Sequence, residues 1–322
     1  MLCCFLKDFF AMSEFSLIYQ NFKNATTKNA LTQVGIGDDC AVSDIPANSQ
    51  LVSCVDVLVA GRHFPLTTSP YAIGYKAVAV NLSDLAAMGA TPYAVLLGLS
   101  LPKTLANDAW LSEVSRGLAD SCAPFGVELI GGDTTQSDTL TVSVTALGFV
   151  PQGEAISRSG AQVGDVVCVS GEIGSASFAL QHILNGQATE LQPALDLPKP
   201  QVTLGQRLRG FAHSMIDISD GLGQDLGHIL KASHVGAKVY LDAIPAADAL
   251  QALPNIEKWQ HQLNGGDDYQ LCFTMSQVNF AKFQQIYPEQ VFCIGEITAE
   301  NSLHLFYNNT KVNVEISGYQ HF

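Results

Sequence analysis

Three features of the sequence predict a fold of two domains in which helices and strands are mixed. The chain has 322 residues, a length that favours two domains over one. Segments that favour strands alternate with segments that favour helices, without internal repeats or low-complexity stretches. A stretch rich in glycine and serine, PQGEAISRSGAQVGD at residues 151–165, is typical of a domain boundary. We therefore expect an N-terminal domain at 13–150 and a C-terminal domain at 151–322.

The N-terminal domain is expected to contain four strands and two helices. A helix should begin with Ser69 as its N-cap and Pro70 at its first helical position, and it should end at Gly89. Asp84 is thereby placed on a helix, one turn after Asn81. A second, amphipathic helix is expected at 107–126. The strands are expected at 50–60, 91–102, 127–133 and 139–150.

The C-terminal domain is expected to begin with a strand at 165–171, followed by the glycine-rich GEIGSASFAL, which opens a helix. Glycines before a helix can cradle a phosphate on free amide groups, although a plain helix cap explains them equally well. Further strands are expected at 214–221, 269–275 and 291–297, and further helices at 222–236 and 277–287. The chain contains no Walker motif and no GxGxxG after a strand, so neither common nucleotide fold is supported.

The charge balance limits the partners of this protein. There are 30 acidic and 16 basic residues, giving a formal charge of −14. So acidic a chain repels nucleic acid and anionic membranes, and we expect neither as a partner. It would also repel a nucleotide unless bound cations reversed the local field.

Cysteine usage and the N-terminus indicate a cytoplasmic protein. The eight cysteines form no CxxC pair and mostly lie in apolar runs, as reduced core residues do. No apolar stretch approaches the roughly 20 residues of a membrane span. The opening segment resembles a signal peptide only superficially, since Lys7 and Asp8 interrupt it. Because MSEFSLI makes a natural start at Met12, residues 1–12 are expected to be a non-native or disordered extension.

Aspartates recur at the ends of apolar stretches, beside glycine or other small residues. They occur in GIGDDCA, NLSDLAAMGA, LIGGDTT, MIDISDG and LNGGDDY. A single such site is more often a turn or a helix cap, but five suggest buried carboxylates, which need partners. Few lysines or arginines stand near these motifs. Metal ions are the remaining partners, and oxygen ligands select Mg²⁺, Mn²⁺ or Ca²⁺.

Taken together with VDVLVAGRHF, YKAVAVNLSDLAAMGA and SRSGAQVGD, these motifs closely resemble the thiamine-monophosphate kinase family. That family belongs to a larger group of ATP-using enzymes that includes aminoimidazole ribonucleotide synthetase. The match covers nearly the whole chain, from about Glu14 onward. The resemblance implies an α+β fold with an N-terminal α+β domain that dimerises through its sheet. Its C-terminal domain would be of α/β type with a mixed sheet.

The resemblance also implies an activity and its cofactors. The γ-phosphoryl group of ATP would pass directly, in line, to thiamine monophosphate, giving thiamine diphosphate. Several Mg²⁺ ions would neutralise the phosphates, since phosphoryl transfer depends on positioning and charge neutralisation. The acceptor is a phosphate oxygen that is already ionised at neutral pH, so no general base is required.

Residue roles are carried over by position in the motifs. The nucleotide would be bound by Gly132, Asp133, Arg158 and Ser219, and the acceptor by His63, Asp267 and Tyr319. The metal positions would be Asp39, Cys54, Val55, Asp56, Asp84, Asp133, Asp217 and Asp220, with Asp38 as a neighbour or turn residue. Cys54 and Val55 depart from the family, which usually has hydroxyl side chains there. A valine offers only its carbonyl and a protonated thiol is a poor Mg²⁺ ligand, so one metal site would rely on main chain and water.

Two alternatives stay open at this point. One is a related enzyme of the same superfamily that uses ATP to activate another substrate. The other is a non-enzymatic protein that binds divalent metals through these acids. A structural metal site should bind Mg²⁺ or Ca²⁺ without ATP, and this property distinguishes the two.

Overall fold

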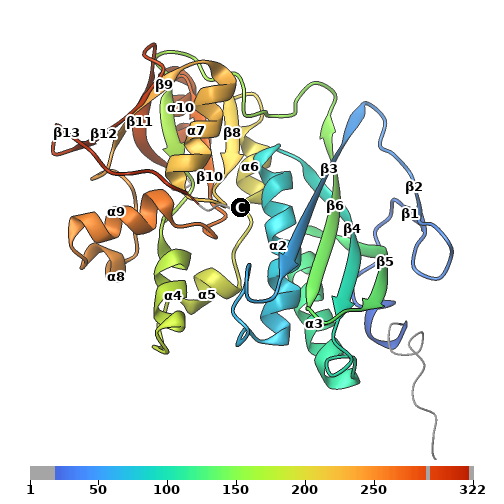
Figure 1. Ribbon diagram of the computed structural model, residues 1–322. Coiled ribbons are helices and arrows are strands. Elements are labelled where there is room, and N and C mark those ends of the chain that lie inside the picture. The colour runs from blue at the N-terminus through green and yellow to red at the C-terminus, as the bar shows by residue number, and fades with distance from the viewer. Residues whose placement is uncertain (1–18, 288–290, 319–322) are drawn as a thin grey trace, which may run out of the picture.

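The computed structural model describes residues 19–287 and 291–318; Tyr319 and the extension expected at 1–12 lie outside this range. The α+β class predicted from the sequence is confirmed, with a four-stranded and a seven-stranded sheet in the two halves of the chain (Figure 1). Within the described residues, no helix is long and apolar enough to cross a membrane.

The N-terminal half is built on a four-stranded sheet in the order β3-β6-β4-β5, in which only β4 and β5 are parallel. A short antiparallel pair, β1 and β2, precedes it. The elements are β1 (Thr32–Val34), β2 (Val42–Ser43), β3 (Ser49–Val59), α2 (Pro70–Ala87), β4 (Thr91–Leu101), α3 (Asp108–Cys122), a 3₁₀ turn (Ala123–Phe125), β5 (Glu128–Gln136) and β6 (Thr141–Pro151).

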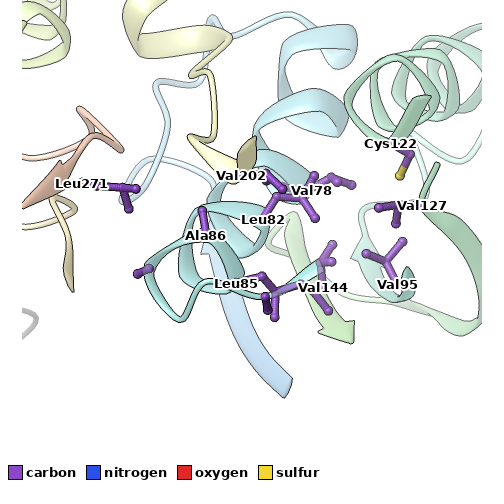
Figure 2. Packing of buried hydrophobic residues seen from close by; sticks show 14 of the residues in the cluster. Val78, Leu82, Leu85, Ala86, Val95, Cys122, Val127, Val144, Val202 and Leu271 are labelled. Atoms are coloured by element: carbon purple, nitrogen blue, oxygen red, sulfur yellow. The ribbon is translucent and has the colours of Figure 1, made fainter. Parts of the chain in front are cut away.

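Helix α2 forms where its sequence signals predict. The Ala72 amide donates to Ser69 Oγ at 3.2 Å, which caps the first turn, and Gly89 has φ +68°, so it ends the helix in the left-handed conformation. Most of its residues are buried, as expected for a helix that is apolar on nearly all sides. Figure 2 shows Val78, Leu82 and Leu85 of α2 in the apolar cluster that contains residues of β4 and β6.

The C-terminal half contains a seven-stranded sheet in the order β13-β12-β9-β11-β7-β10-β8, which is mixed because only β12 and β9 pair in parallel. Its strands are β7 (Val166–Val169), β8 (Ser214–Asp217), β9 (Gly236–Tyr240), β10 (Leu271–Met275), β11 (Phe292–Thr298), β12 (Leu303–Tyr307) and β13 (Thr310–Val312). Its helices are α4 (Ser175–Leu184), α5 (Gln192–Asp196), α6 (Val202–Leu208), α7 (Leu222–Ser233), α8 (Asp248–Gln251), α9 (Asn255–Asn264) and α10 (Gln277–Ile286).

One apolar core joins the two halves. It includes Leu82 and Leu85 from α2 together with Val202 from α6 and Leu271 from β10. Figure 1 shows α2 between the four-stranded sheet and the C-terminal half. A separate cluster, with Leu226 of α7 and Leu263 of α9, covers the other face of the seven-stranded sheet. The shared core fixes α2 against β8, and this contact positions the candidate site.

The cysteines follow the expectation in part. Cys122, Cys168 and Cys272 are buried free thiols, whereas Cys40 and Cys293 are exposed. The prediction that they are core residues is therefore wrong for the last two.

Candidate active site

A cavity of about 730 Å³ lies where the two halves meet. Its walls come from β3 and α2 on one side, and from β8, α4 and the segment between α9 and β10 on the other. A smaller cavity of about 230 Å³ adjoins it, lined by Cys54 and Arg158 and sharing Asp84 and Asp217. Seven residues singled out in the sequence line the larger cavity: Asp56, His63, Asp84, Asp217, Ser219, Asp220 and Asp267.

Strand alternation decides which β3 side chains face the site. Cys54 and Asp56 are partly buried, whereas the Val55 side chain is 58% exposed, on the opposite face of the sheet. Asn81 of α2 holds this strand in place, because its Oδ1 accepts from the Asp56 amide at 3.1 Å. The Cys54 thiol donates to the Asn81 carbonyl at 3.4 Å. The Val55 side chain therefore points away from the site, and only its main chain is turned towards it.

Asp84 and Asp217 come together from opposite halves of the chain. Burial, followed by the charge of Asp217, raises the pKa of Asp84 well above its ordinary value. Burial raises the pKa of Asp217 too, while a 2.8 Å hydrogen bond donated by the Ser83 hydroxyl and the charge of Arg158 oppose that rise. Burial also raises the pKa of Asp56. These three carboxylates repel one another in a partly dehydrated place, which is the situation a divalent cation relieves.

Ser219 and Asp220 follow β8 in a loop that a buried acid holds in place. The amides of both residues donate to Asp225 Oδ2 at 3.0 Å. Gln224 Nε2 donates to the Asp220 carboxylate at 3.0 Å. Asp225 lies in the first turn of α7 and is 2% exposed. Asp225 therefore fixes the positions of Ser219 and Asp220, which line the cavity.

Asp267 and His63 line the same cavity. Asp267 Oδ1 lies 2.9 Å from the ammonium group of Lys76, which is 2% exposed on α2. The expectation that these acids lack cationic partners is therefore wrong for Asp267, whose partner stands in another motif, YKAVAVNLSDLAAMGA. His63 Nδ1 accepts from the Val59 amide at 3.0 Å, so a neutral His63 ring carries its proton on Nε2.

Asp268 has a different place from its neighbour. Its carboxylate accepts from the Gly174 amide at 2.7 Å and from the Ala176 amide at 3.4 Å. The chain's own acid thus occupies the N-terminus of α4, the helix that GEIGSASFAL opens. Of the two interpretations of that segment, the helix cap is confirmed, because the amide groups that could hold a phosphate are taken.

Other residues singled out in the sequence lie outside both cavities. Asp38 and Asp39 lie in the exposed loop between β1 and β2, and Gly132 and Asp133 are exposed within β5. The expectation of buried carboxylates is wrong for these three acids, because the apolar run before each of them ends before the acid is reached. Arg158, also exposed, nevertheless contributes to the wall of the smaller cavity.

Several residues that shape the site were not singled out from the sequence. Lys76 and Asp84 are the only charged residues of α2, and a lysine in so apolar a helix signals a paired, buried charge. Ser83 gave no such signal, because its partner Asp217 lies 134 positions away. Asp225 was missed although it lies only five and six positions after the residues whose amides it accepts from. The remaining cavity residues include Arg62, Ser177, Asn264 and Tyr269.

The donor set fits Mg²⁺ better than a transition metal. Among the described residues, no group of three or more His, Cys, Asp or Glu side chains is arranged to hold a metal ion alone. Mg²⁺ is commonly held by one or two carboxylates together with water and substrate phosphates. Asp56, Asp84 and Asp217 supply hard oxygen ligands, and burial raises the pKa of each of them. The thiol nearby does not compete, since burial and then the charges of Asp84 and Asp56 raise the pKa of Cys54.

Comparison with known proteins places the chain in a family. Residues 37–150 match the N-terminal domain and residues 162–308 the C-terminal domain of AIR synthase related proteins. The thiamine-monophosphate kinase of Escherichia coli K12 is 40% identical over 326 residues, covering 97% of this chain and 99% of the relative.

Solved structures agree with this placement. The crystal structure of thiamine-monophosphate kinase from Stenotrophomonas maltophilia K279a superposes with a TM-score of 0.82 at 40% identity, covering 90% of this chain and 95% of that one. The structure of AaThiL complexed with AMPPCP and TMP gives a TM-score of 0.76 at 28% identity, covering 99% and 100%. The chain therefore belongs to the thiamine-monophosphate kinase family of AIR synthase related proteins.

Proposed function

We propose that the protein transfers the γ-phosphoryl group of ATP to thiamine monophosphate and releases thiamine diphosphate. The observation that carries this proposal is the cavity at the junction of the halves. Repelling carboxylates, Asp84 and Asp217, stand in one part of its wall, and the paired acid Asp267 stands in another. A chain related over its whole length binds AMPPCP and TMP, the ligand classes that such a cavity would take. The two alternatives raised from the sequence are not favoured by these relatives.

The carboxylate end is proposed to hold Mg²⁺. Bound there, Mg²⁺ would neutralise charge on the phosphates of both substrates. Ser83 orients Asp217 through its 2.8 Å hydrogen bond, and Asn81 fixes the strand that carries Asp56. The proposed metal positions are those inferred from the motifs: Asp39, Cys54, Val55, Asp56, Asp84, Asp133, Asp217 and Asp220. Cys54 and Val55 would act through main chain and water.

The nucleotide and the acceptor are proposed to approach from different sides of the metal. Gly132, Asp133, Arg158 and Ser219 would contact ATP, and the charge of Arg158 already opposes the rise in the pKa of Asp84 and Asp217. His63, Asp267 and Tyr319 would contact the acceptor. No side chain has to remove a proton, because the attacking oxygen belongs to an ionised phosphate.

The decisive experiment mixes purified protein with ATP, Mg²⁺ and thiamine monophosphate and measures thiamine diphosphate. Free thiamine serves as the control acceptor. It lacks the phosphate that the metal could bind, and its hydroxyl would need a base to remove its proton. We expect efficient turnover of thiamine monophosphate and hardly any of thiamine. EDTA should abolish the reaction. Equal use of both acceptors, or turnover that survives EDTA, would refute the proposal.

A dimer formed through the four-stranded sheet is proposed as well. The face of β3 turned away from α2 exposes Leu51 by 55%, Val55 by 58% and Val57 by 48%. Such an apolar strip on a sheet suits a second copy of the chain. Leu51→Lys should shift sedimentation towards the monomer, whereas Val163→Lys, an equally exposed valine in the linker, should not. A wild-type monomer at micromolar concentration would contradict the proposal.

The domain limits and the location of the protein complete the proposal. The N-terminal domain, 13–150, would supply the dimer and most metal positions, and the C-terminal domain, 151–322, would complete the nucleotide and acceptor sites. Free thiols at each of the six described cysteines suit a cytoplasmic enzyme.

A further inference from the structure

The cavity wall contains a cation that is almost completely buried. Lys76 is 2% exposed, and its ammonium group lies 2.9 Å from Asp267 Oδ1. It also donates to the His63 carbonyl at 3.5 Å. Both of these partners line the cavity and both belong to the proposed acceptor site. Lys76 itself is not part of the cavity wall, so it contacts the site only through them.

The loop that carries Asp267 is held in an unusual conformation. Asp267 and Tyr269 have φ angles of +70° and +49°, which residues with a side chain rarely adopt. The Tyr269 hydroxyl donates to Asp267 Oδ1 at 3.0 Å, the same oxygen that pairs with Lys76. The Asp267 amide donates to the Ser219 carbonyl at 2.9 Å. Because two donors contact the same carboxylate oxygen, the Asp267 side chain is held in one rotamer. Its other oxygen, Oδ2, therefore has a fixed position.

The pairing changes what Asp267 can offer to a ligand. A lone carboxylate would attract the thiazolium ring by its net charge. Because Asp267 is paired with the buried ammonium group of Lys76, the two residues together carry no net charge. Asp267 Oδ2, for which the described residues provide no partner, remains as a directed hydrogen-bond acceptor beside the cavity. Orientation, and not net attraction, is then what Asp267 contributes.

We propose that Lys76 is a positioning residue that determines acceptor recognition through Asp267. It selects the rotamer of Asp267 and joins the acceptor loop of the C-terminal half to the helix that carries Asp84. The role rests on the proposed function, since it concerns the acceptor of that reaction. The proposal predicts that loss of Lys76 weakens binding of the acceptor and leaves binding of the nucleotide unchanged.

The test measures kcat and both KM values for Lys76→Met, Asp267→Asn and the double variant. For Lys76→Met we expect the KM for thiamine monophosphate to rise at least about tenfold, with the KM for ATP within about twofold of wild type. Removing one partner of a buried pair should also lower the Tm, by about 5 °C or more. Lys238→Met is the matched control, because Lys238 makes an ion pair of the same length, 2.9 Å, with Glu296 at an exposed site. It should leave both KM values unchanged.

The double variant separates positioning from simple structural support. With both charges gone no buried charge is left uncompensated, so the Tm should recover towards wild type. If Lys76 acts through Asp267, the acceptor KM should stay at least about tenfold high, and no higher than in the worse single variant. Recovery of both the Tm and the acceptor KM would overturn the proposal, because the pair would then only hold the fold.

The outcomes also separate this proposal from the proposed function. If the wild-type protein forms thiamine diphosphate and Asp267→Asn raises the acceptor KM while a folded Lys76→Met does not, the inference about Lys76 alone fails. If Asp267→Asn leaves the acceptor KM unchanged and raises that for ATP, the acceptor pocket itself has been assigned wrongly. Tyr269→Phe removes only the second donor to Oδ1 and should raise the acceptor KM about threefold.

Discussion

The cavity has two parts that differ in how the negative charge of their buried carboxylates is compensated. At one, Asp267 is paired with the ammonium group of Lys76 at 2.9 Å. At the other, Asp84 and Asp217 face each other, and burial together with mutual repulsion raises the pKa of Asp84. Both parts depend on α2, which carries Lys76 and Asp84 about 12 Å apart along its axis.

The difference indicates which part needs a ligand to be complete. A paired charge is satisfied within the chain, and it can serve as a fixed contact surface before substrate arrives. Repelling carboxylates carry an electrostatic cost until a cation is bound. The paired acid is therefore suited to orienting an acceptor, and the repelling acids are suited to metal-dependent chemistry.

The largest expected effect comes from removing a charge at the repelling part. Asp84→Asn should lower kcat at saturating Mg²⁺ by a factor on the order of 1,000, because a metal-held charge that stabilises the transition state is lost. The metal-free Tm should not fall, since the substitution also removes repulsion from Asp217 and Asp56. Turnover and Tm are measured side by side.

Asp138→Asn is the control for this variant, because Asp138 is exposed in the turn between β5 and β6. It should behave as wild type in both measurements. An Asp84→Asn variant with near-normal turnover, or one that unfolds without metal, would show that Asp84 is held as Asp267 is held, by partners within the protein.

A pH titration tests another buried carboxylate, Asp268, which is satisfied by amides rather than by a cation. Burial raises its pKa to about 7, although the Gly174 and Ala176 amides oppose that rise. Since the unfolded carboxyl has a pKa of 3.8, the unfolded state binds fewer protons between these values. The stability contributed by the protonated group is thus full below about pH 4 and is lost as the pH rises to about 7.

Urea unfolding of wild type and Asp268→Asn across pH 4–8 measures this contribution. The difference in the free energy of unfolding between the two should change over the window by up to about 4 kcal/mol, in favour of the variant at higher pH. Parallel curves would show that the two amide hydrogen bonds keep Asp268 ionised throughout, as a capping carboxylate.

Local signals in the sequence predicted much of the fold. Ser69, Pro70 and Gly89 mark the ends of α2, and the alternation in β3 places Asp56 inward. The expected strand at 127–133 instead extends to Gln136, because pairing with β4 continues past Gly132, and this places Asp133 within an exposed strand end. Elements with weak patterns, such as β9 and α9, were not predicted.

The candidate site was predictable where the acids themselves carry the signal, and not where folding supplies their partners. Asp84 and Asp217 are 133 positions apart, and nothing local shows that they meet or that Ser83 bonds one of them. The same holds for Lys76 and Asp267, which are 191 positions apart. A motif gives the residue types of a site, whereas its electrostatics depend on contacts between distant segments.

A smaller effect is expected from the hydroxyl that orients Asp217. Ser83 is fully buried, and its Oγ donates to Asp217 Oδ2 at 2.8 Å. Ser83→Ala should lower kcat about tenfold, because a hydrogen bond to a charged group is lost while the charge remains. Ser121→Ala is matched to it: Ser121 is as deeply placed, and its Oγ has no hydrogen-bond partner among the described residues. Equal loss in both variants would mean that packing, not orientation, accounts for the effect.

The smallest effect is expected at Cys54, which faces the repelling carboxylates from β3. Burial raises the pKa of its thiol, and its Sγ donates to the Asn81 carbonyl, so it stays protonated and gives a metal little. Cys54→Ser would place a hard oxygen at this position, and we expect the Mg²⁺ concentration at half-maximal rate to fall about twofold to threefold, with kcat unchanged. Cys54→Ala should leave the Mg²⁺ dependence as it is. If Cys54→Ala raised the Mg²⁺ concentration at half-maximal rate as much as Asp84→Asn does, the thiol would have to bind the metal as a thiolate. Cys54 would then count among the charged groups of the repelling part of the cavity.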